Sequence, residues 1–210
     1  MSVLQRIAYY QNRRDEAPNQ QLARELAAAR DKNGVREIAK NLWNENAHVS
    51  NDCLKVLYEI GYLEPALIAP YVNDFLKLLT QKNNRLVWGS MIALSTIAAL
   101  QATAIFKRVD EITSVIERGS VITRDNGIKT LAIVAAQSET YRKKIFPYLV
   151  KQLETCRPKE IPQYAEHIVV AVNTKNRNEF VRVLERRLSE MPPSRAARIR
   201  RVIKKTNTWN

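Results

Sequence analysis

Three stretches of this chain carry apolar residues at the same spacing, and this recurrence constrains the fold more than any other feature. The three sets are Leu54, Leu57, Val72 and Leu76; Leu94, Ile97, Ile112 and Ile116; and Leu131, Val134, Leu149 and Leu153. They start at residues 54, 94 and 131, which are 40 and then 37 residues apart. A period of this length, built from two helical stretches, is typical of stacked helix pairs. The sequence therefore predicts an all-α superhelix.

Helix start and stop signals divide the chain into repeats. The clearest repeats span residues 50–80, 84–118, 122–155 and 159–191, and the residues Ser50, Asn51 and Asp52 offer the start signal of the first. Within them we expect each second helix to be continuous, for example over residues 104–118. Pro70 and Pro147 each follow the first leucine of their set by 16 residues, and Pro70 suits the first turn of a second helix.

The two ends of the chain carry weaker helix signals. We expect a short helix over residues 2–13, a second over 20–30 that Gly34 terminates in a left-handed conformation, and a third that closes at Trp43. A basic terminal helix over 194–205 follows the last repeat, and 206–210 should fray. The prediction is thus a single solenoid domain over residues 1–210, with about five helix pairs plus terminal helices.

Composition limits the class of protein. Hydrophobic residues make up 45% of the chain and charged residues 26%, which favours a packed core over disorder. No uninterrupted apolar run reaches the roughly 18 residues of a membrane span, and no secretory signal is recognisable at the N-terminus. Cys53 and Cys156 lie far apart in sequence without metal-motif spacing. We expect an intracellular, cytoplasmic protein, or a nuclear one if the source is eukaryotic, with no membrane partner, no cofactor and no metal.

The repeats resemble a known superfamily. The segments Thr123–Leu131 and Asn84–Leu94, together with the leading leucine and the second-helix proline, resemble HEAT repeats of the HEAT/armadillo type. The resemblance covers about residues 35–190. It implies an α-solenoid, and members of this superfamily bind proteins, nucleic acids or both.

One enzymatic branch of that superfamily provides a further alternative. HEAT-like DNA alkylation-repair glycosylases use aromatic residues and an acidic residue on the concave face of such a stack, and Trp43, Trp88 and Asp125 would be the corresponding residues here. The chain departs from that family because its Trp-x-Leu-Arg run is absent and the matching stretch 128–136 has no aromatic residue. We therefore assign no catalytic residue.

Positive charge is concentrated near the C-terminus. The formal net charge is +13, and residues 173–210 hold 11 Lys and Arg against 3 Asp and Glu. Such a surface attracts polyanions, and Arg fits phosphate well. The predicted polyanion-binding residues are Arg182, Arg186, Arg187, Arg195, Arg198, Arg200, Arg201, Lys204 and Lys205.

These observations leave three functional hypotheses. The leading one is a non-enzymatic binding or scaffold protein whose helical-repeat surface holds a macromolecular partner, most readily a protein. The alternative is nucleic-acid binding, to DNA or RNA, through the basic C-terminal end. The second alternative is a HEAT-like DNA glycosylase. A charge run can also be no more than a solvated face, and a terminal repeat needs a polar outer surface.

Overall fold

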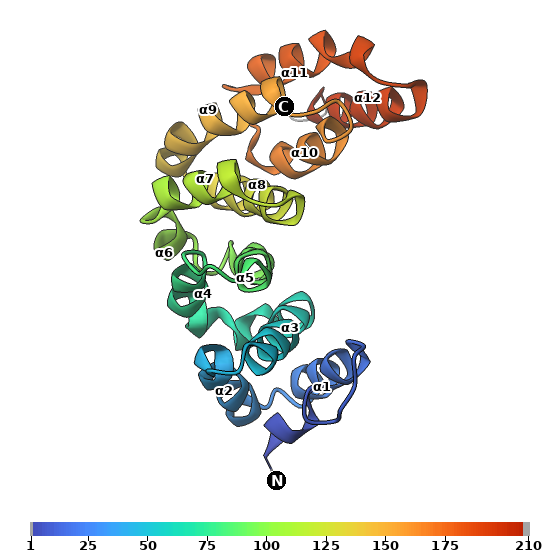
Figure 1. The fold of residues 1–210 in the computed structure, drawn as a ribbon. Helices are drawn as coiled ribbons and strands as arrows, with labels where there is room; N and C mark the ends of the chain where they lie inside the picture. The colour runs from blue at the N-terminus through green and yellow to red at the C-terminus, as the bar shows by residue number, and fades with distance from the viewer. Residues whose placement is uncertain (1, 208–210) are drawn as a thin grey trace. The chain divides into compact units, whose positions relative to one another are not determined.

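The chain folds into helices that form two compact units. A computed structural model describes residues 2–207, and no β-strand occurs within that range. The units are Met1–Asn126 and Gly127–Asn210, and their boundary falls inside helix α8 (Val121–Ala136) (Figure 1). The single domain over residues 1–210 stays a prediction.

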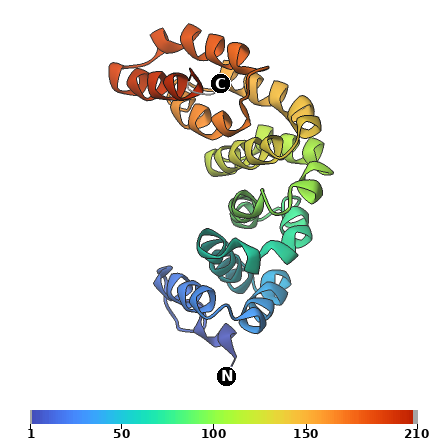
Figure 2. The same ribbon diagram turned by 180° about the vertical axis from the view of Figure 1, so that it is seen from behind.

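The first unit is built from two layers of helices. Its helices are α1 (Ala17–Ala28), α2 (Lys32–Lys40), α3 (Ala47–Leu63), α4 (Val72–Leu78), α5 (Asn84–Ile97), α6 (Ala102–Phe106) and α7 (Val109–Arg118). Short 3-10 helices are η1 (Val3–Arg6), η2 (Asn41–Trp43), η3 (Pro65–Leu67) and η4 (Ala69–Tyr71). Helices α1, α3 and α5 pack side by side as the leading layer, and α2, α4 and α6 lie beside them as the second layer (Figures 1 and 2).

The second unit continues the pairing. After the end of α8 come α9 (Glu139–Thr155), α10 (Ile161–Ile168) with η5 (Val169–Ala171), α11 (Arg177–Arg186) with η6 (Leu188–Glu190), and α12 (Pro193–Asn207). Helix α9 packs against α11, and α10 packs against α12. The chain thus has the five predicted pairs, α1/α2, α3/α4, α5/α7, α8/α9 and α10/α11, followed by the basic helix α12, and the all-α repeat prediction is confirmed.

The recurrent apolar residues form the cores of the units. None of the twelve residues of the three sets is more than 5% exposed. Burying one Leu or Ile side chain is worth roughly 1.5–3 kcal/mol. The pattern that predicted the fold is therefore also the pattern that stabilises it.

Several helices begin at a capping side chain. Asn46 caps α3 by accepting a hydrogen bond from the backbone N–H of His48, and Asn83 caps α5 in the same way through Arg85. The predicted start of α3 at Ser50–Asp52 was late, because Asn46 provides the cap one turn earlier.

The end of α1 differs from the prediction. The residue with left-handed backbone is Arg30, with φ of 49°, and no described glycine has positive φ. The N–H groups of Arg30 and Asp31 donate to the carbonyls of Ala27 and Leu26, which closes the helix. Gly34 lies inside α2, where an added Cβ would come within 2.6 Å of the Leu26 side chain. Gly34 therefore allows α1 and α2 to approach closely, and it is not a cap.

The N-terminal segment is mostly irregular. The helix predicted over residues 2–13 is limited to η1, and Asn12 has φ of 52°. Side chains of other helices take up the N–H groups of this segment. Asn19 accepts from Ala8 at 2.8 Å, and Asp52 accepts from Tyr9 at 2.8 Å. These bonds replace the helical ones.

Three further boundaries differ from the prediction. The helix expected over 104–118 is divided into α6 and α7. Pro70 lies in the 3-10 turn η4, whereas Pro147 lies inside the continuous helix α9, so equal sequence offsets give different local structures. The terminal helix extends to Asn207 and does not fray at Thr206, and residues 208–210 lie outside the described part of the chain.

We predict that Leu57→Ala destabilises the protein by about 2–5 kcal/mol, because it leaves a cavity in the core beneath α3. Leu57 is fully buried, whereas Leu63 on the same helix is 54% exposed. The matched variant Leu63→Ala should change stability by less than about 0.5 kcal/mol. Urea unfolding followed by circular dichroism measures both values, and equal effects would contradict the assignment of the core.

Candidate functional site

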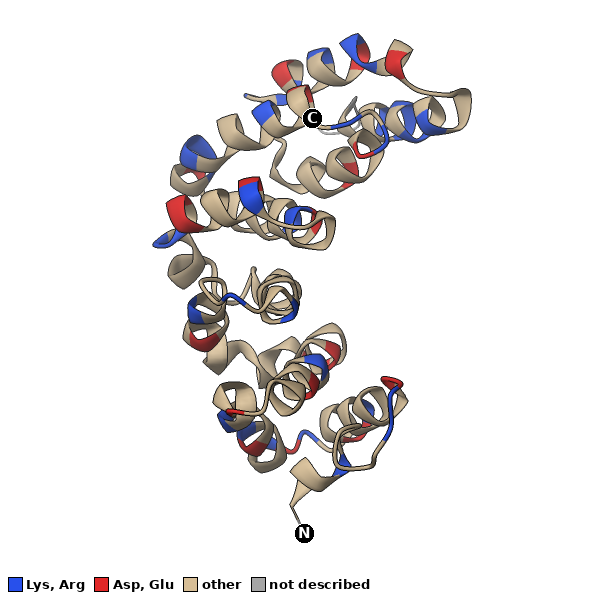
Figure 3. Ribbon diagram, viewed as in Figure 1, with Lys and Arg blue, Asp and Glu red and all other residues tan. Residues whose placement is uncertain are grey.

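Positive charge is unevenly divided between the two units. Residues 127–210 contain 18 Lys and Arg against 7 Asp and Glu, a net charge of +11, which leaves +2 of the total +13 for residues 1–126. Figure 3 shows both signs mixed along the helices of the first unit and mainly basic residues on α12. The second unit therefore carries most of the net positive charge of the chain.

Helix α12 has one apolar face, and all of its charged residues are basic. It carries six Lys and Arg and no Asp or Glu. The side chains of Ala196, Ile199 and Val202 are buried, and Ile203 is half-buried. This face packs against α10 and α11. The predicted apolar seam thus holds the helix in place and leaves its basic residues at the surface.

A shallow groove runs between α10 and α12. Its volume is about 330 Å³, and its walls are formed by Glu166, Val169, Arg198, Arg201, Val202 and Lys205. Because Arg198, Arg201 and Lys205 are three and four residues apart, successive helical turns bring them to the same side of α12. The groove therefore offers a row of cations, flanked by one carboxylate and by apolar side chains.

Arg198 and Glu166 form a two-bond ion pair at one wall of this groove. Arg198 Nε lies 2.9 Å from Glu166 Oε1, and Nη2 lies 2.6 Å from Oε2. The hydrogen bond from Arg198 lowers the pKa of Glu166, opposed by burial and assisted by nearby positive charge that includes Arg201. The pair holds the Arg198 guanidinium in one orientation.

Five of the other predicted residues are freely exposed. Within residues 2–207 no hydrogen bond or ion pair engages the exposed side chains of Arg182, Arg195, Arg200, Arg201 and Lys204. Arg186 is paired with Glu154 at 2.9 Å. Most of the residues predicted for polyanion binding are thus available at the surface of the second unit.

Arg187 is the exception. It is 6% exposed, and its guanidinium donates to the backbone carbonyls of Leu153 (2.6 Å) and Cys156 (2.9 Å). It is also paired with Glu190, and this hydrogen bond raises the pKa of Arg187. The sequence grouped Arg187 with the surface arginines, but the structure places it in the interior, where it satisfies the carbonyls at the end of α9.

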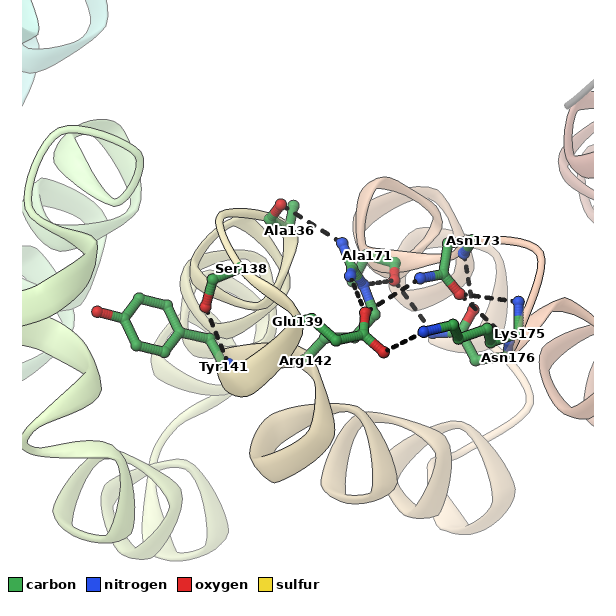
Figure 4. Close-up of polar contacts among 9 residues, drawn as sticks. All are labelled: Ala136, Ser138, Glu139, Tyr141, Arg142, Ala171, Asn173, Lys175 and Asn176. Atoms are coloured by element: carbon green, nitrogen blue, oxygen red, sulfur yellow. Dashed lines mark hydrogen bonds and ion pairs between the residues drawn. The ribbon is translucent and has the colours of Figure 1, made fainter.

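A second arginine of this kind was not singled out in the sequence. Arg142 donates to the carbonyls of Ala171 (3.0 Å) and Ala136 (3.4 Å) and to Glu139 (2.8 Å). Glu139 also accepts from Lys175 at 3.2 Å (Figure 4). The ends of α8 and η5 are joined to the start of α9 by this network. No local signal in the sequence distinguishes such an arginine from an exposed one.

The residues considered for base excision do not gather in one place. Trp43 donates from Nε1 to Asp74 of α4 at 3.0 Å, in the second layer. Trp88 of α5 packs against Tyr58 of the leading layer, with ring centroids 6.2 Å apart. Asp125 lies on α8, close enough to Tyr62 that its charge, after burial and Glu59, contributes to the raised pKa of Tyr62. The structure thus places Trp43 beside the second layer and Trp88 in the leading layer.

Cys53 is buried and Cys156 is half-buried, and the pKa of each thiol is raised. Burial, followed by the charges of Asp52 and Glu37, raises the pKa of Cys53 to about 12. Burial raises the pKa of Cys156 to about 11.

In the described part of the chain no three His, Cys, Asp or Glu side chains are grouped as metal ligands would be. No described helix combines the length and apolar character that crossing a bilayer requires.

Comparison with solved structures shows the same fold. An engineered protein matches with a TM-score of 0.69 and 19% identity, covering 100% of this chain and 99% of its own. A designed armadillo repeat protein in complex with the peptide (KR)4 matches with a TM-score of 0.67 and 14% identity, covering 88% and 86%. Another designed armadillo repeat protein gives 0.66 and 16%, covering 93% and 96%.

The chain therefore has a helical-repeat fold of the HEAT/armadillo type. No protein-family model matches the sequence. No curated protein matches it. At these identities the likeness shows the fold alone, so function must be argued from the chain's own surfaces.

We predict that Arg187→Ala destabilises the second unit by about 2–4 kcal/mol, because it leaves buried carbonyls without donors. The matched variant Arg182→Ala, which removes an exposed arginine of the preceding helix α11, should change stability by less than about 0.5 kcal/mol. Thermal and urea unfolding measure the difference. A neutral Arg187→Ala variant would contradict the interior role assigned to this arginine.

Proposed function

We propose that this chain is a non-enzymatic binding protein whose macromolecular partner is a nucleic acid, held by the basic surface of the second unit. The observation that carries the proposal is the net charge of +11 in residues 127–210, with six basic and no acidic residues on α12. Cations that neutralise phosphates release counterions, which is the main source of sequence-independent affinity.

The groove between α10 and α12 gives this charge a local arrangement. Arg201 and Lys205 lie along it one turn apart, and Glu166 orients Arg198 beside them. Planar guanidinium groups suit phosphate oxygens. No side chain identified here would read base edges, so we expect binding through the phosphate backbone with little sequence preference.

The positive net charge of the chain also indicates which charge a partner should carry. One of the designed armadillo proteins with this fold is in complex with the basic peptide (KR)4. The present chain has a net charge of +13, so a polycation would be repelled at long range. A partner with negative charge is favoured instead.

We predict salt-dependent binding of duplex DNA that is lost on charge reversal of the groove. Arg201→Glu with Lys205→Glu should weaken binding at least about tenfold at about 50 mM salt and lower the salt slope by about 2, because two phosphate contacts are removed. Fluorescence anisotropy with labelled duplex DNA and single-stranded RNA, between about 50 and 200 mM salt, measures both quantities.

A matched control separates the groove from net charge. Lys77→Glu with Lys82→Glu makes the same change in charge on exposed lysines of the first unit. This control should retain most of the affinity. If both double variants lose affinity equally, the groove has no special role. If the unmodified protein shows no salt-dependent binding, the proposed function fails.

A second candidate is a polypeptide partner on the leading layer of the first unit. Tyr62 is 53% exposed and packs edge-on against Tyr58, with ring centroids 6.4 Å apart, and Tyr58 in turn contacts Trp88. Lys55 and Glu59 form an ion pair of 2.7 Å beside these rings. Aromatic side chains next to fixed charges are typical of protein-binding surfaces.

We predict that peptides selected from a random library bind this aromatic face. Tyr62→Ala should weaken such peptides by about tenfold or more, because exposed aromatic anchors dominate interface energies. Trp43→Ala removes an exposed aromatic residue of the second layer and serves as the control. Selected peptides that bind both variants equally well would exclude the leading layer as their site.

A further inference from the structure

A hollow in the first unit lies apart from the basic groove and from the aromatic face. It has a volume of about 340 Å³ and opens where residues 8–16 cross the N-terminal ends of α3 and α5. His48, Asn51 and Asp52 from the first turns of α3 and Arg85 from the first turn of α5 contribute to its wall. Its size lies at the lower end of the roughly 300–1,000 Å³ range of small-molecule sites.

Hydrogen bonds hold the wall of the hollow in place. Asn19 and Asp52 accept from the backbone N–H groups of Ala8 and Tyr9, both at 2.8 Å. Asn46 Nδ2 donates to the Tyr9 hydroxyl at 2.7 Å, and the Tyr9 ring lies parallel to the His48 ring with centroids 6.0 Å apart. A ligand would therefore meet a largely preformed site, which reduces the ordering cost of binding.

Two of the three carboxylates at the hollow already have basic partners. Asp15 accepts from Arg13 at 2.8 Å and from the N–H of Ala17, and the Arg13 hydrogen bond holds the pKa of Asp15 below its ordinary value. Glu16 lies 2.8 Å from Lys55 Nζ and 2.9 Å from Arg85 Nη2. Lys55 is also paired with Glu59 at 2.7 Å, so these two cations and two carboxylates balance, and Arg14 is the cation at the hollow that these carboxylates do not neutralise.

Several donors at the hollow have no acceptor. No hydrogen bond or ion pair within residues 2–207 engages the Arg14 guanidinium or the His48 ring nitrogens. Asn51 Oδ1 accepts from Asn83 at 3.2 Å, which leaves the Asn51 NH2 group to donate elsewhere. The N-terminal ends of α3 and α5 add partial positive charge on the same side. Together these groups match an oxyanion.

Asp52 places a different requirement on a ligand, because it offers a hydrogen-bond acceptor where the other groups offer donors. Its Oδ2 accepts from Tyr9, while Oδ1 makes no further bond in the part of the chain that the structure describes. It is the carboxylate at the hollow without a basic partner. Next to an oxyanion site, a free carboxylate oxygen accepts from a hydroxyl group and disfavours a second anionic group on the ligand.

We propose that this hollow binds a small phosphomonoester that carries hydroxyl groups, such as a sugar phosphate. Arg14 and Asn51 hold the phosphate oxygens, and Asp52 accepts from a hydroxyl of the same molecule. The parallel Tyr9 and His48 rings form the remaining wall, and the other sides of the hollow are open to solvent. The proposal is independent of nucleic-acid binding, because its residues all lie in the first unit.

Isothermal titration calorimetry on the full-length Arg201→Glu, Lys205→Glu protein tests the proposal, because the basic groove is then disabled. The probes are ribose 5-phosphate, inorganic phosphate, ribose and citrate. We expect ribose 5-phosphate to bind at least about tenfold more tightly than inorganic phosphate, and ribose not to bind. Equal binding of inorganic phosphate, or tighter binding of citrate, would overturn the assigned ligand chemistry.

Variants of the hollow locate the binding. Arg14→Ala should weaken ribose 5-phosphate by about tenfold or more, as expected for one lost charge-assisted hydrogen bond. Asp52→Asn should remove the preference over inorganic phosphate. Arg24→Ala, on the exposed surface of α1, is the control and should bind as the parent does. Unchanged affinity in Arg14→Ala, with circular dichroism showing an intact fold, would overturn the site.

DNA binding is measured on the same variants and compared with that of the unmodified chain. A failure of the phosphomonoester proposal can then be told apart from a failure of the nucleic-acid proposal.

Discussion

Burial of helices that are apolar on more than one side is the constraint on which the rest of this structure depends. In the first unit α3 packs against α1, α2 and α5, so its buried residues include Leu54 and Val56, which lie on nearly opposite sides of one helix. No single pair can hide such a helix. The consequence is a layered arrangement in which most polar residues lie along the outer edges of the helices, so a binding surface has to be built mainly from those edges.

Polar side chains complete the fold where the apolar contacts end. Arg142 and Arg187 serve the carbonyls at helix C-termini in the second unit, and Glu16 links Lys55 of α3 to Arg85 of α5 in the first. For buried Lys55, burial opposes the charged form, but the hydrogen bonds to Glu16 and Glu59 outweigh it and raise the pKa. Basic residues thus divide into those that hold the structure together and those that are exposed at the surface.

The sequence predicted the repeats well and the polar details poorly, for a physical reason. Apolar periodicity is repeated many times along a helix, so the twelve core positions and the five pairs follow from it. Whether Arg187 is buried or exposed depends on the carbonyls of Leu153 and Cys156, which lie 34 and 31 residues away in the sequence. The hollow beside Arg14 depends on a non-helical N-terminal segment bonded to Asn19 and Asp52. Such long-range bonds leave no periodic trace in one sequence.

The first unit carries little of the positive charge, but it is joined to the unit that carries most of it. Residues 1–126 have a net charge of only +2, but they are covalently continuous with the strongly basic residues 127–210 through α8. If the basic part binds a nucleic acid, as proposed above, the first unit is held near that polymer at a high effective concentration without contributing to the attraction. Weak contacts of the first unit can then act locally, at affinities that would be negligible for a free molecule.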